Sequence, residues 1–176
     1  MYSVLEKIVM LKSVHLFSEM PNESLAALAM VLSEQEIPRG VDVLTKGTMG
    51  NSLFILAVGS VSVHDGLGTE MAVLQANDFF GEFAALVSEM RMATVTTLER
   101  SVFFVLEQAH LFDIMLENRD VLQALITTLV TRMRVLLHSS AQQQASLAQL
   151  AAAEASRHEL GFFGSIGPER HVLSVA

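Results

Sequence analysis

The sequence has no cysteine and no tryptophan, one tyrosine and three prolines among its 176 residues. The absence of cysteine excludes a disulfide scaffold, cysteine-ligated zinc and a catalytic thiol. Long apolar runs are also missing: the densest covers eight residues, 25–32, whereas a membrane span needs about 18. Glu6, Lys7 and Lys12 are not typical of a secretory signal. We therefore expect no transmembrane segment in this chain and a cytoplasmic location, which includes the cytosolic part of a larger, membrane-bound protein.

Positive charge is scarce, because 11 Lys and Arg residues face 19 Asp and Glu residues and the net charge is −8. A nucleic-acid groove would be lined with cations. The segment after Leu136 contains only two basic residues, Arg157 and Arg170. A helix-turn-helix unit needs ~60–70 residues and a basic recognition helix. We therefore expect no DNA partner.

The composition is otherwise that of a packed domain. Hydrophobic residues make up 51% of the chain and charged residues 17%, which excludes an intrinsically disordered chain. The length fits one domain with a small appendage.

The N-terminal part of the chain has the hydrophobic period of helices. Residues 3–12 place Val4, Ile8 and Leu11 on one helical face. Pro21 to Ser24 resembles a helix start, and the apolar series that follows is Leu25, Leu28, Ala29 and Leu32. The second helix is expected to end before the breaker cluster at 37–40. We assign residues 1–35 to an N-terminal helical segment.

After this part the hydrophobic period changes to two. Short apolar runs between residues 41 and 106 are separated by turn signals at 46–50, 58–60, 65–68 and 76–78. Many short strands with turns every 8–12 residues indicate an all-β sandwich or barrel. We assign residues 36–107 to a β-barrel.

Helical periodicity returns after the barrel. A short helix is expected over 109–117 and a longer one from about Arg119. The apolar stripe of the longer helix consists of Leu122, Leu125, Ile126, Leu129, Met133 and Leu136. This stripe is core or helix-interface material first, with a homodimer seam as the alternative. We assign 108–140 to C-terminal helices and 141–176 to an Ala/Gln-rich extension, helical or disordered, and a flexible tail.

One segment of the barrel, residues 79–95, carries the candidate chemistry. Gly81 allows close approach of a ligand and unusual backbone dihedrals. A helix that starts there leaves its first amides without intrahelical partners, and these amides together with the helix dipole suit a phosphate. Arg91 follows Glu82 by nine residues. If the chain turns back after a short helix, the guanidinium reaches the same helix terminus.

Arg91 is the only basic residue between Gly47 and Glu99, a window that holds six acidic residues. An isolated arginine among apolar strands needs an anionic partner, either a protein carboxylate or a ligand phosphate. Glu82 would repel a phosphate placed directly against it, so it fits better as the acceptor for a sugar hydroxyl. Phosphate donors beside a hydroxyl acceptor indicate a nucleotide.

Phe80-Gly81-Glu82, a short apolar helix and Arg91-Met92-Ala93-Thr94-Val95 resemble the phosphate-binding cassette of cyclic nucleotide-binding domains. Catabolite activator protein, regulatory subunits of protein kinase A and cyclic-nucleotide-gated channels contain such domains. The resemblance covers roughly residues 12–136 and includes the strand-turn pattern at 46–63. It implies a mainly β fold, a double-stranded β-helix (jelly-roll) barrel with the short cassette helix and N- and C-terminal helices.

The resemblance also implies residue roles. Arg91 would pair with the cyclic phosphate, Glu82 would accept from the ribose 2′-hydroxyl, and Gly81 and Ala93 would belong to the same cassette. The amides of Phe83, Ala84 and Met92 would complete the phosphate cradle. Met92 lacks the hydroxyl by which members that prefer cGMP contact guanine, so cAMP is the expected ligand and cGMP the second candidate.

Two positions depart from the family's pattern. Met90 stands where proline is common, and Asn77 stands where glycine is common. Asparagine tolerates the left-handed conformation, so we expect the turn before the cassette to be intact.

The expected function is a regulatory, non-catalytic module whose ligand moves the C-terminal helices, with an effector domain or protein outside this chain. The alternative is a degenerate domain that keeps the fold, binds no nucleotide and pairs Arg91 with Glu82 or Glu89. Gly47, Gly50 and Gly59 are interpreted as turn glycines. The six histidines lack metal-ligand spacing, and no nucleophile-base pair is evident, so no metal, cofactor or catalytic residue is predicted.

Overall fold

The computed structural model describes residues 1–65, 67–134, 137 and 149. The chain divides into two compact units, Met1–Leu129 and Val130–Ala176. Within the described residues, no helix has both the length and the apolarity needed to cross a membrane. The predicted extension over 141–176 lies outside the described residues except for Gln149.

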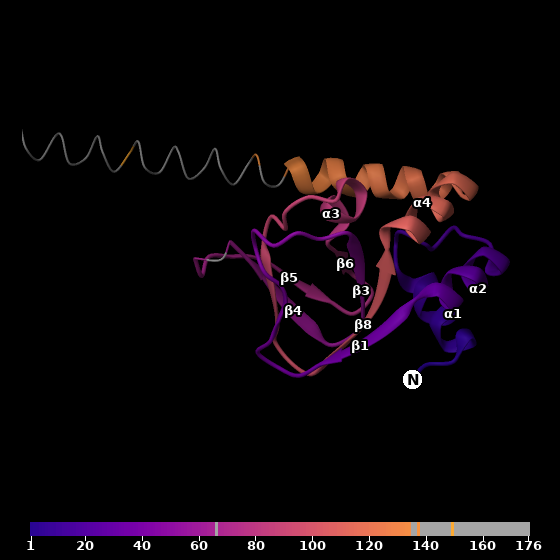
Figure 1. Ribbon diagram of the computed structural model, residues 1–176, viewed down its shortest axis with the longest axis horizontal. Helices are drawn as coiled ribbons and strands as arrows, with labels where there is room; N and C mark the ends of the chain where they lie inside the picture. Colours follow the sequence, from indigo (N-terminus) through magenta and orange to yellow (C-terminus); the bar gives the residue numbers. More distant parts are fainter. Residues whose placement is uncertain (66, 135–136, 138–148, 150–176) are drawn as a thin grey trace, which may run out of the picture. The chain divides into compact units, whose positions relative to one another are not determined.

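The first unit consists of two helices, a set of strands interrupted by one short helix, and further helices (Figure 1). The elements are α1 (Val4–Ser13), α2 (Asn22–Val31), β1 (Ser33–Ile37), β2 (Asp42–Leu44), β3 (Ser52–Val58), β4 (Ser60–His64), β5 (Glu70–Gln75), β6 (Phe79–Phe80), α3 (Glu82–Val87), β7 (Thr94–Thr97), β8 (Ser101–Glu107) and α4 (Gln108–Glu117). Residues 119–129 of this unit are helical as well, and so are residues 130–134 of the second unit. This is the predicted jelly-roll architecture with flanking helices.

The strands form two antiparallel four-stranded sheets, ordered β1-β8-β3-β6 and β2-β7-β4-β5. In β3 the first six residues are all buried. Successive side chains of a strand point to opposite faces, so the run is apolar because both faces of this sheet are covered.

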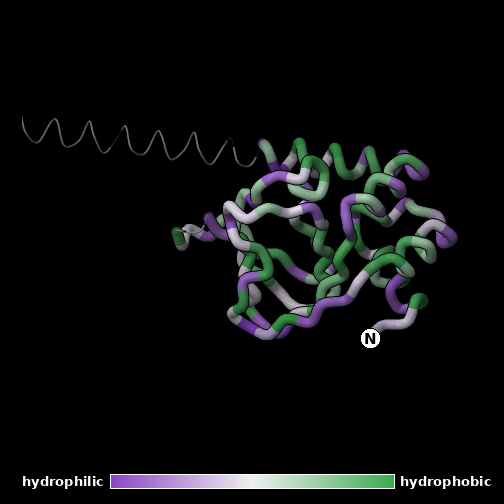
Figure 2. The backbone as a smooth tube through the Cα atoms, viewed as in Figure 1, coloured by the Kyte–Doolittle hydropathy of each residue, from purple (hydrophilic) through white to green (hydrophobic). Residues whose placement is uncertain are grey.

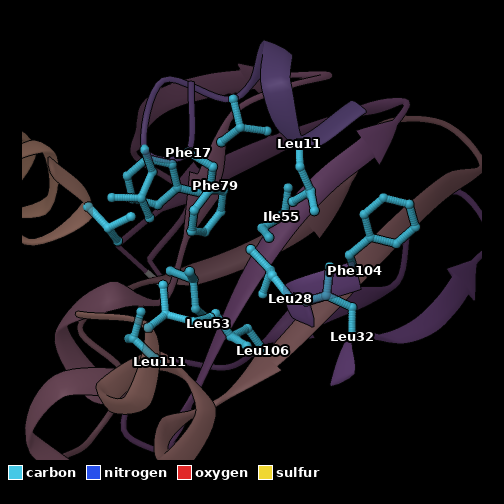
Figure 3. Close-up of a cluster of buried hydrophobic side chains, with 14 of the residues drawn as sticks. Leu11, Phe17, Leu28, Leu32, Leu53, Ile55, Phe79, Phe104, Leu106 and Leu111 are labelled. Carbon is cyan, nitrogen blue, oxygen red and sulfur yellow. The ribbon is translucent and has the colours of Figure 1, made fainter. Parts of the chain in front are cut away.

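The two faces of the first sheet belong to two hydrophobic clusters. Phe54 and Leu56 of β3 pack in the cluster between the sheets with Val61 and Val95 of the second sheet. Leu53 and Ile55 pack in the other cluster, with side chains of the helices (Figure 3). Leu11 of α1, Leu28 of α2 and Leu111 of α4 belong to this helix-covered cluster. The helix-covered cluster therefore holds the helices and the barrel together.

The N-terminal segment differs from its prediction in two respects. The second helix ends at Val31, and Ser33–Ile37 form β1 rather than the end of the helical segment. This strand lies at the edge of its sheet, where polar residues are tolerated, so its sequence lacks strand-like alternation. Val4, predicted to share one helical face with Ile8 and Leu11, is 43% exposed, whereas Leu11 and Lys7 are buried.

The predicted stripe on the helix after α4 is split in the structure. Val121 and Leu125 are buried, whereas Leu122, Ile126 and Met133 are exposed. Leu129 packs against the helix-covered cluster at its edge, and Leu136 lies outside the described residues. The buried face follows the i, i+4 pair Val121 and Leu125. Hydrophobic residues are frequent along this helix (Figure 2), and both buried and exposed ones occur among them.

Candidate functional site

The turn into α3 has the backbone conformation that its sequence predicts. Asn77 has φ +77° and Gly81 has φ +81°, both in the left-handed region. The prediction that asparagine supports the turn before the cassette is confirmed. Gly81 is the residue immediately before α3, and Glu82 begins the helix. The first amides of α3 therefore follow a tight turn that starts at the end of β6.

Arg91 lies at the N-terminus of α3, as the spacing predicts. Its Nη1 donates to the carbonyl oxygens of Gly81 and Ser52, each at 3.0 Å, and Nη2 donates to Ser52 Oγ at 3.4 Å. The guanidinium carbon lies 5.8 Å from the centre of the Phe54 ring. The side chain is buried, with 6% exposure. All these hydrogen-bond acceptors are neutral groups.

Two glycines make room for this side chain. A Cβ atom on Gly50 would collide with Nε and Cζ of Arg91, and a Cβ atom on Gly81 would lie 2.7 Å from Nη1. Real Cβ atoms essentially never show contacts this short. Gly50, interpreted from sequence as a turn glycine, thus also provides the space in which the guanidinium lies.

The backbone at Arg91 is fixed by the loop at 47–50. The Arg91 amide donates to Thr48 O, and Gly47 N donates to Arg91 O, each at 2.8 Å. Met49 and Met90 form an antiparallel bridge beside these bonds. The position that lacks the common proline, Met90, is therefore held by pairing with the opposite segment.

Two carboxylates, the buried Glu82 and the exposed Glu107, act on the guanidinium through their charge. Burial lowers the pKa of Arg91 from its ordinary value, and the negative charges of Glu82 and Glu107 oppose this shift. Glu82 is 2% exposed. A cation and a carboxylate thus approach one another at the start of α3, in a region where a ligand's charge would be weakly screened.

The remaining predicted site residues lie along the same turn and the segment that returns from α3. Ala84 is buried and Phe83 is half-buried in the first turn of α3. Met92 is 55% exposed, and Ala93 is half-buried just before β7. The structure brings Gly81 into contact with Arg91, and Glu82 acts on Arg91 through its charge.

The sequence alone did not indicate which side chains hold Arg91 from the other side. Ser52 contributes two acceptors, and Phe54 contributes a ring face. Both lie about 40 positions earlier in β3, and register alone brings them near, since Phe54 pairs with Phe80 next to Gly81. The short apolar run of β3 signals a strand, but no local pattern indicates which of its side chains approach the cassette.

A separate hollow of about 640 Å³ lies at the N-terminal end of the molecule. Tyr2, Glu34, Val58, Arg100 and Val102 are among its lining residues, and none of the predicted site residues lines it. Volume alone therefore does not identify the candidate site, which is recognised by its buried charges.

Comparisons with known proteins show which domains this chain is similar to. The family model described as the cyclic nucleotide-binding domain matches residues 34–118. The chain is 33% identical over 98 residues to the regulatory subunit of a cAMP-dependent protein kinase from Hypocrea atroviridis, covering 49% of this chain and 21% of that protein. It is also 33% identical over 98 residues to cGMP-dependent protein kinase, isozyme 1, from Drosophila melanogaster, covering 52% and 13%.

Solved structures share the fold. The catabolite activator protein of Thermus thermophilus superposes with a TM-score of 0.63 at 21% identity, covering 78% of this chain and 63% of that one. The chain spans about a fifth or less of the length of the two curated relatives above. The likeness therefore concerns one domain of each.

Proposed function

Residues 34–118 belong to the cyclic nucleotide-binding domain family, and on this basis we propose that the chain is a regulatory, non-catalytic module that binds cAMP at the cassette and transmits binding to its C-terminal helices. The observation that carries the proposal is Arg91, a buried guanidinium at the start of α3 whose hydrogen bonds within the described residues reach neutral acceptors.

Arg91 is the proposed partner of the cyclic phosphate. A guanidinium has five N–H donors in a planar fork, and the hydrogen bonds above use Nη1 and Nη2. A phosphate would supply full negative charge in a buried setting, where charge-assisted bonds are strong. The amides of Phe83, Ala84 and Met92 are the proposed further donors.

Glu82 is the proposed acceptor for the ribose 2′-hydroxyl. Its carboxylate is buried and its charge acts on Arg91, so one ligand that carries both a phosphate and a hydroxyl can engage both residues. Gly81 and Ala93 line the same site in this proposal, because neither carries a side chain that would fill it.

The proposed preference for cAMP rests on Met92. Its thioether offers no hydroxyl to a guanine, and the relatives include kinases named for each nucleotide. A solved relative, the regulatory domain of a protein kinase A from Toxoplasma gondii, is a co-crystal structure with cAMP. The second candidate ligand is cGMP.

The proposed route to the C-terminal helices begins at the end of α3. Ser88 Oγ donates to Oε1 of Gln108, the first residue of α4, at 2.8 Å. The Gln108 amide donates to Asn51 O at 3.0 Å, next to Ser52. Movement of α3 on ligand binding would thus act directly on the start of α4.

The effector in this proposal is a domain or protein outside the chain, and the location is the cytoplasm. The exposed side chains Leu122 and Ile126 support a homodimer as one arrangement of the helix that follows α4. Hydrogen exchange over residues 108–129 with and without cAMP tests the coupling. Equal protection in both states would contradict it.

A structural domain without nucleotide is the competing function, and one observation favours it. Arg91 is already held by three side-chain hydrogen bonds, so internal acceptors can stabilise it. Titration calorimetry with cAMP, cGMP and non-cyclic AMP distinguishes the two functions. We expect saturable binding of cAMP, weaker binding of cGMP and none of AMP; no heat with any nucleotide would contradict the proposed function.

A further inference from the structure

Arg91 uses one edge of its guanidinium for hydrogen bonds within the protein. The two N–H groups of Nη1 donate to the carbonyl oxygens of Ser52 and Gly81, and Nη2 donates to Ser52 Oγ. A guanidinium has five N–H donors, so Nε–H and the second N–H of Nη2 remain. Neither of these two groups has a hydrogen-bond acceptor among the described residues.

The two remaining donors share an edge that no side chain covers at Gly50. Nε–H and one N–H of Nη2 point along the same edge of the planar guanidinium. A Cβ atom on Gly50 would collide with Nε and would lie 2.7 Å from Nη2. Two parallel N–H groups match two oxygens of one phosphate. The edge formed by Nε–H and Nη2–H therefore suits bidentate contact with a ligand phosphate.

Ser52 holds the opposite edge from a fixed position in the barrel. It pairs with Glu107 in the ladder between β3 and β8, and the amide of Gln108 donates to Asn51 O at 3.0 Å. Side chains alternate along a strand, so Ser52 shares a face with Phe54, over whose ring the guanidinium lies. Ser52 is buried, with 9% exposure. Its two acceptor atoms are thus held in place by the sheet.

We propose that Ser52 is a positioning residue for ligand binding: its carbonyl and hydroxyl oxygens orient Arg91 so that the edge formed by Nε–H and Nη2–H faces the ligand phosphate. This inference rests on the proposed function. The hydroxyl of Ser52 is the one acceptor of Nη2 among the described residues. Without it, the guanidinium turns more freely about its Nε–Cζ bond, and the two donors are less often aligned with the phosphate.

The first experiment follows the guanidinium without ligand. In the full chain labelled with ¹⁵N-arginine, NMR exchange between the Arg91 Nη1 and Nη2 signals measures rotation about Nε–Cζ. We expect rotation at least about threefold faster in Ser52→Ala. Ser62→Ala is the matched control, because Ser62 is a strand serine with 8% exposure whose hydroxyl donates to Glu70. A smaller increase in Ser52→Ala, or an equal increase in Ser62→Ala, overturns the inference.

The second experiment measures the Kd of cAMP by titration calorimetry. We expect a rise of at least about threefold in Ser52→Ala. Ser52→Thr, which keeps the hydroxyl, and Ser62→Ala should bind like the unsubstituted chain. A smaller rise in Ser52→Ala, or an equal rise in either of the other two variants, overturns the inference. If the unsubstituted chain binds no cAMP, the proposed function fails, whereas the rotation rate still decides whether Ser52 orients Arg91.

Discussion

Lys7 and Arg91 are both buried cations that lie over a phenylalanine ring, yet different groups accept their hydrogen bonds. The Lys7 ammonium lies 5.6 Å from the Phe104 ring centre, 3.1 Å from a Glu34 carboxylate oxygen and 3.1 Å from Leu32 O. The Arg91 guanidinium lies over Phe54 and donates to the carbonyl oxygens of Ser52 and Gly81.

This difference separates Lys7, a structural cation, from Arg91, the cation that we propose to bind the ligand. Lys7 joins the end of α2 to Glu34 of β1, so its charge is neutralised inside the fold by a directly bonded carboxylate. The bonds of Arg91 leave its charge to be balanced by the field of Glu82 and Glu107. A ligand phosphate can therefore improve the electrostatics around Arg91, whereas no ligand is needed at Lys7.

The largest expected effect is on nucleotide binding by Arg91→Ala. Loss of a partly buried, charge-assisted phosphate contact should cost about 2–5 kcal/mol of binding free energy, while circular dichroism shows an unchanged fold. Arg39→Ala, at an exposed arginine, is the control and should bind like the unsubstituted chain. Binding within about threefold in Arg91→Ala would remove Arg91 from the site.

Lys7→Met should lower the free energy of unfolding without a matching loss of nucleotide binding. Methionine keeps the apolar stem but leaves Glu34 and the carbonyl of Leu32 without the ammonium. We expect the free energy of unfolding to fall by about 2 kcal/mol, below the usual cost of breaking a fully buried pair because Glu34 retains partial exposure. Urea unfolding measures the loss. A matching loss of cAMP affinity would show that the two cations are not independent.

Gly81→Ala is expected to have an intermediate effect on both properties. The residue has φ +81°, and its new Cβ would lie 2.7 Å from Arg91 Nη1. Strain of about 1–2 kcal/mol should reduce stability, and displacement of the guanidinium should weaken cAMP binding. Gly40→Ala has a similar φ of +78° with no atom within 4 Å of its Cβ, so it isolates the strain. Equal cAMP affinity in the two variants would contradict the steric account.

The pH dependence of stability should test the ion pair between Lys7 and Glu34. Burial by itself raises the pKa of Glu34, but hydrogen bonds from the Tyr2 amide and Lys7 outweigh it, and the pKa lies below the ordinary value of 4.5. A lowered pKa means that the carboxylate contributes stability above pH 4.5 and loses it as the pH falls through the folded-state pKa. The difference in unfolding free energy between the unsubstituted chain and Glu34→Gln should therefore shrink below pH 4.5. A difference that is constant from pH 6 to 3 would contradict this.

Met92→Thr should give the smallest change. A hydroxyl at this position would offer guanine a hydrogen bond, worth about 0.5–1.5 kcal/mol. The ratio of cGMP to cAMP affinity should rise accordingly, as measured by competition binding. An unchanged ratio would mean that residue 92 does not face the base.

The comparison also shows what the sequence could predict. The cassette is local: Gly81, the short helix and Arg91 are close in the chain, so their spacing was enough to predict that the guanidinium reaches the start of α3, and the contact with Gly81 O confirms it. The strand periodicity similarly predicted the barrel.

The surroundings of both cations are non-local and were not predicted. Lys7 is charged and lies on a helix, and its burial depends on Glu34 in an edge strand whose sequence does not alternate. Ser52 and Gly50 contact Arg91 through sheet register and loop pairing. Such contacts depend on tertiary structure, which overrides local pattern.

The most direct test of Arg91 as the phosphate-binding cation is NMR of ¹⁵N-arginine protein titrated with cAMP. We expect the Arg91 Nε–H resonance to shift with the same saturation curve as the ligand's ³¹P resonance, while the Lys7 ammonium resonance, followed with ¹⁵N-lysine, stays in place. Saturation of the phosphorus signal with an unmoved Arg91 resonance would contradict the account.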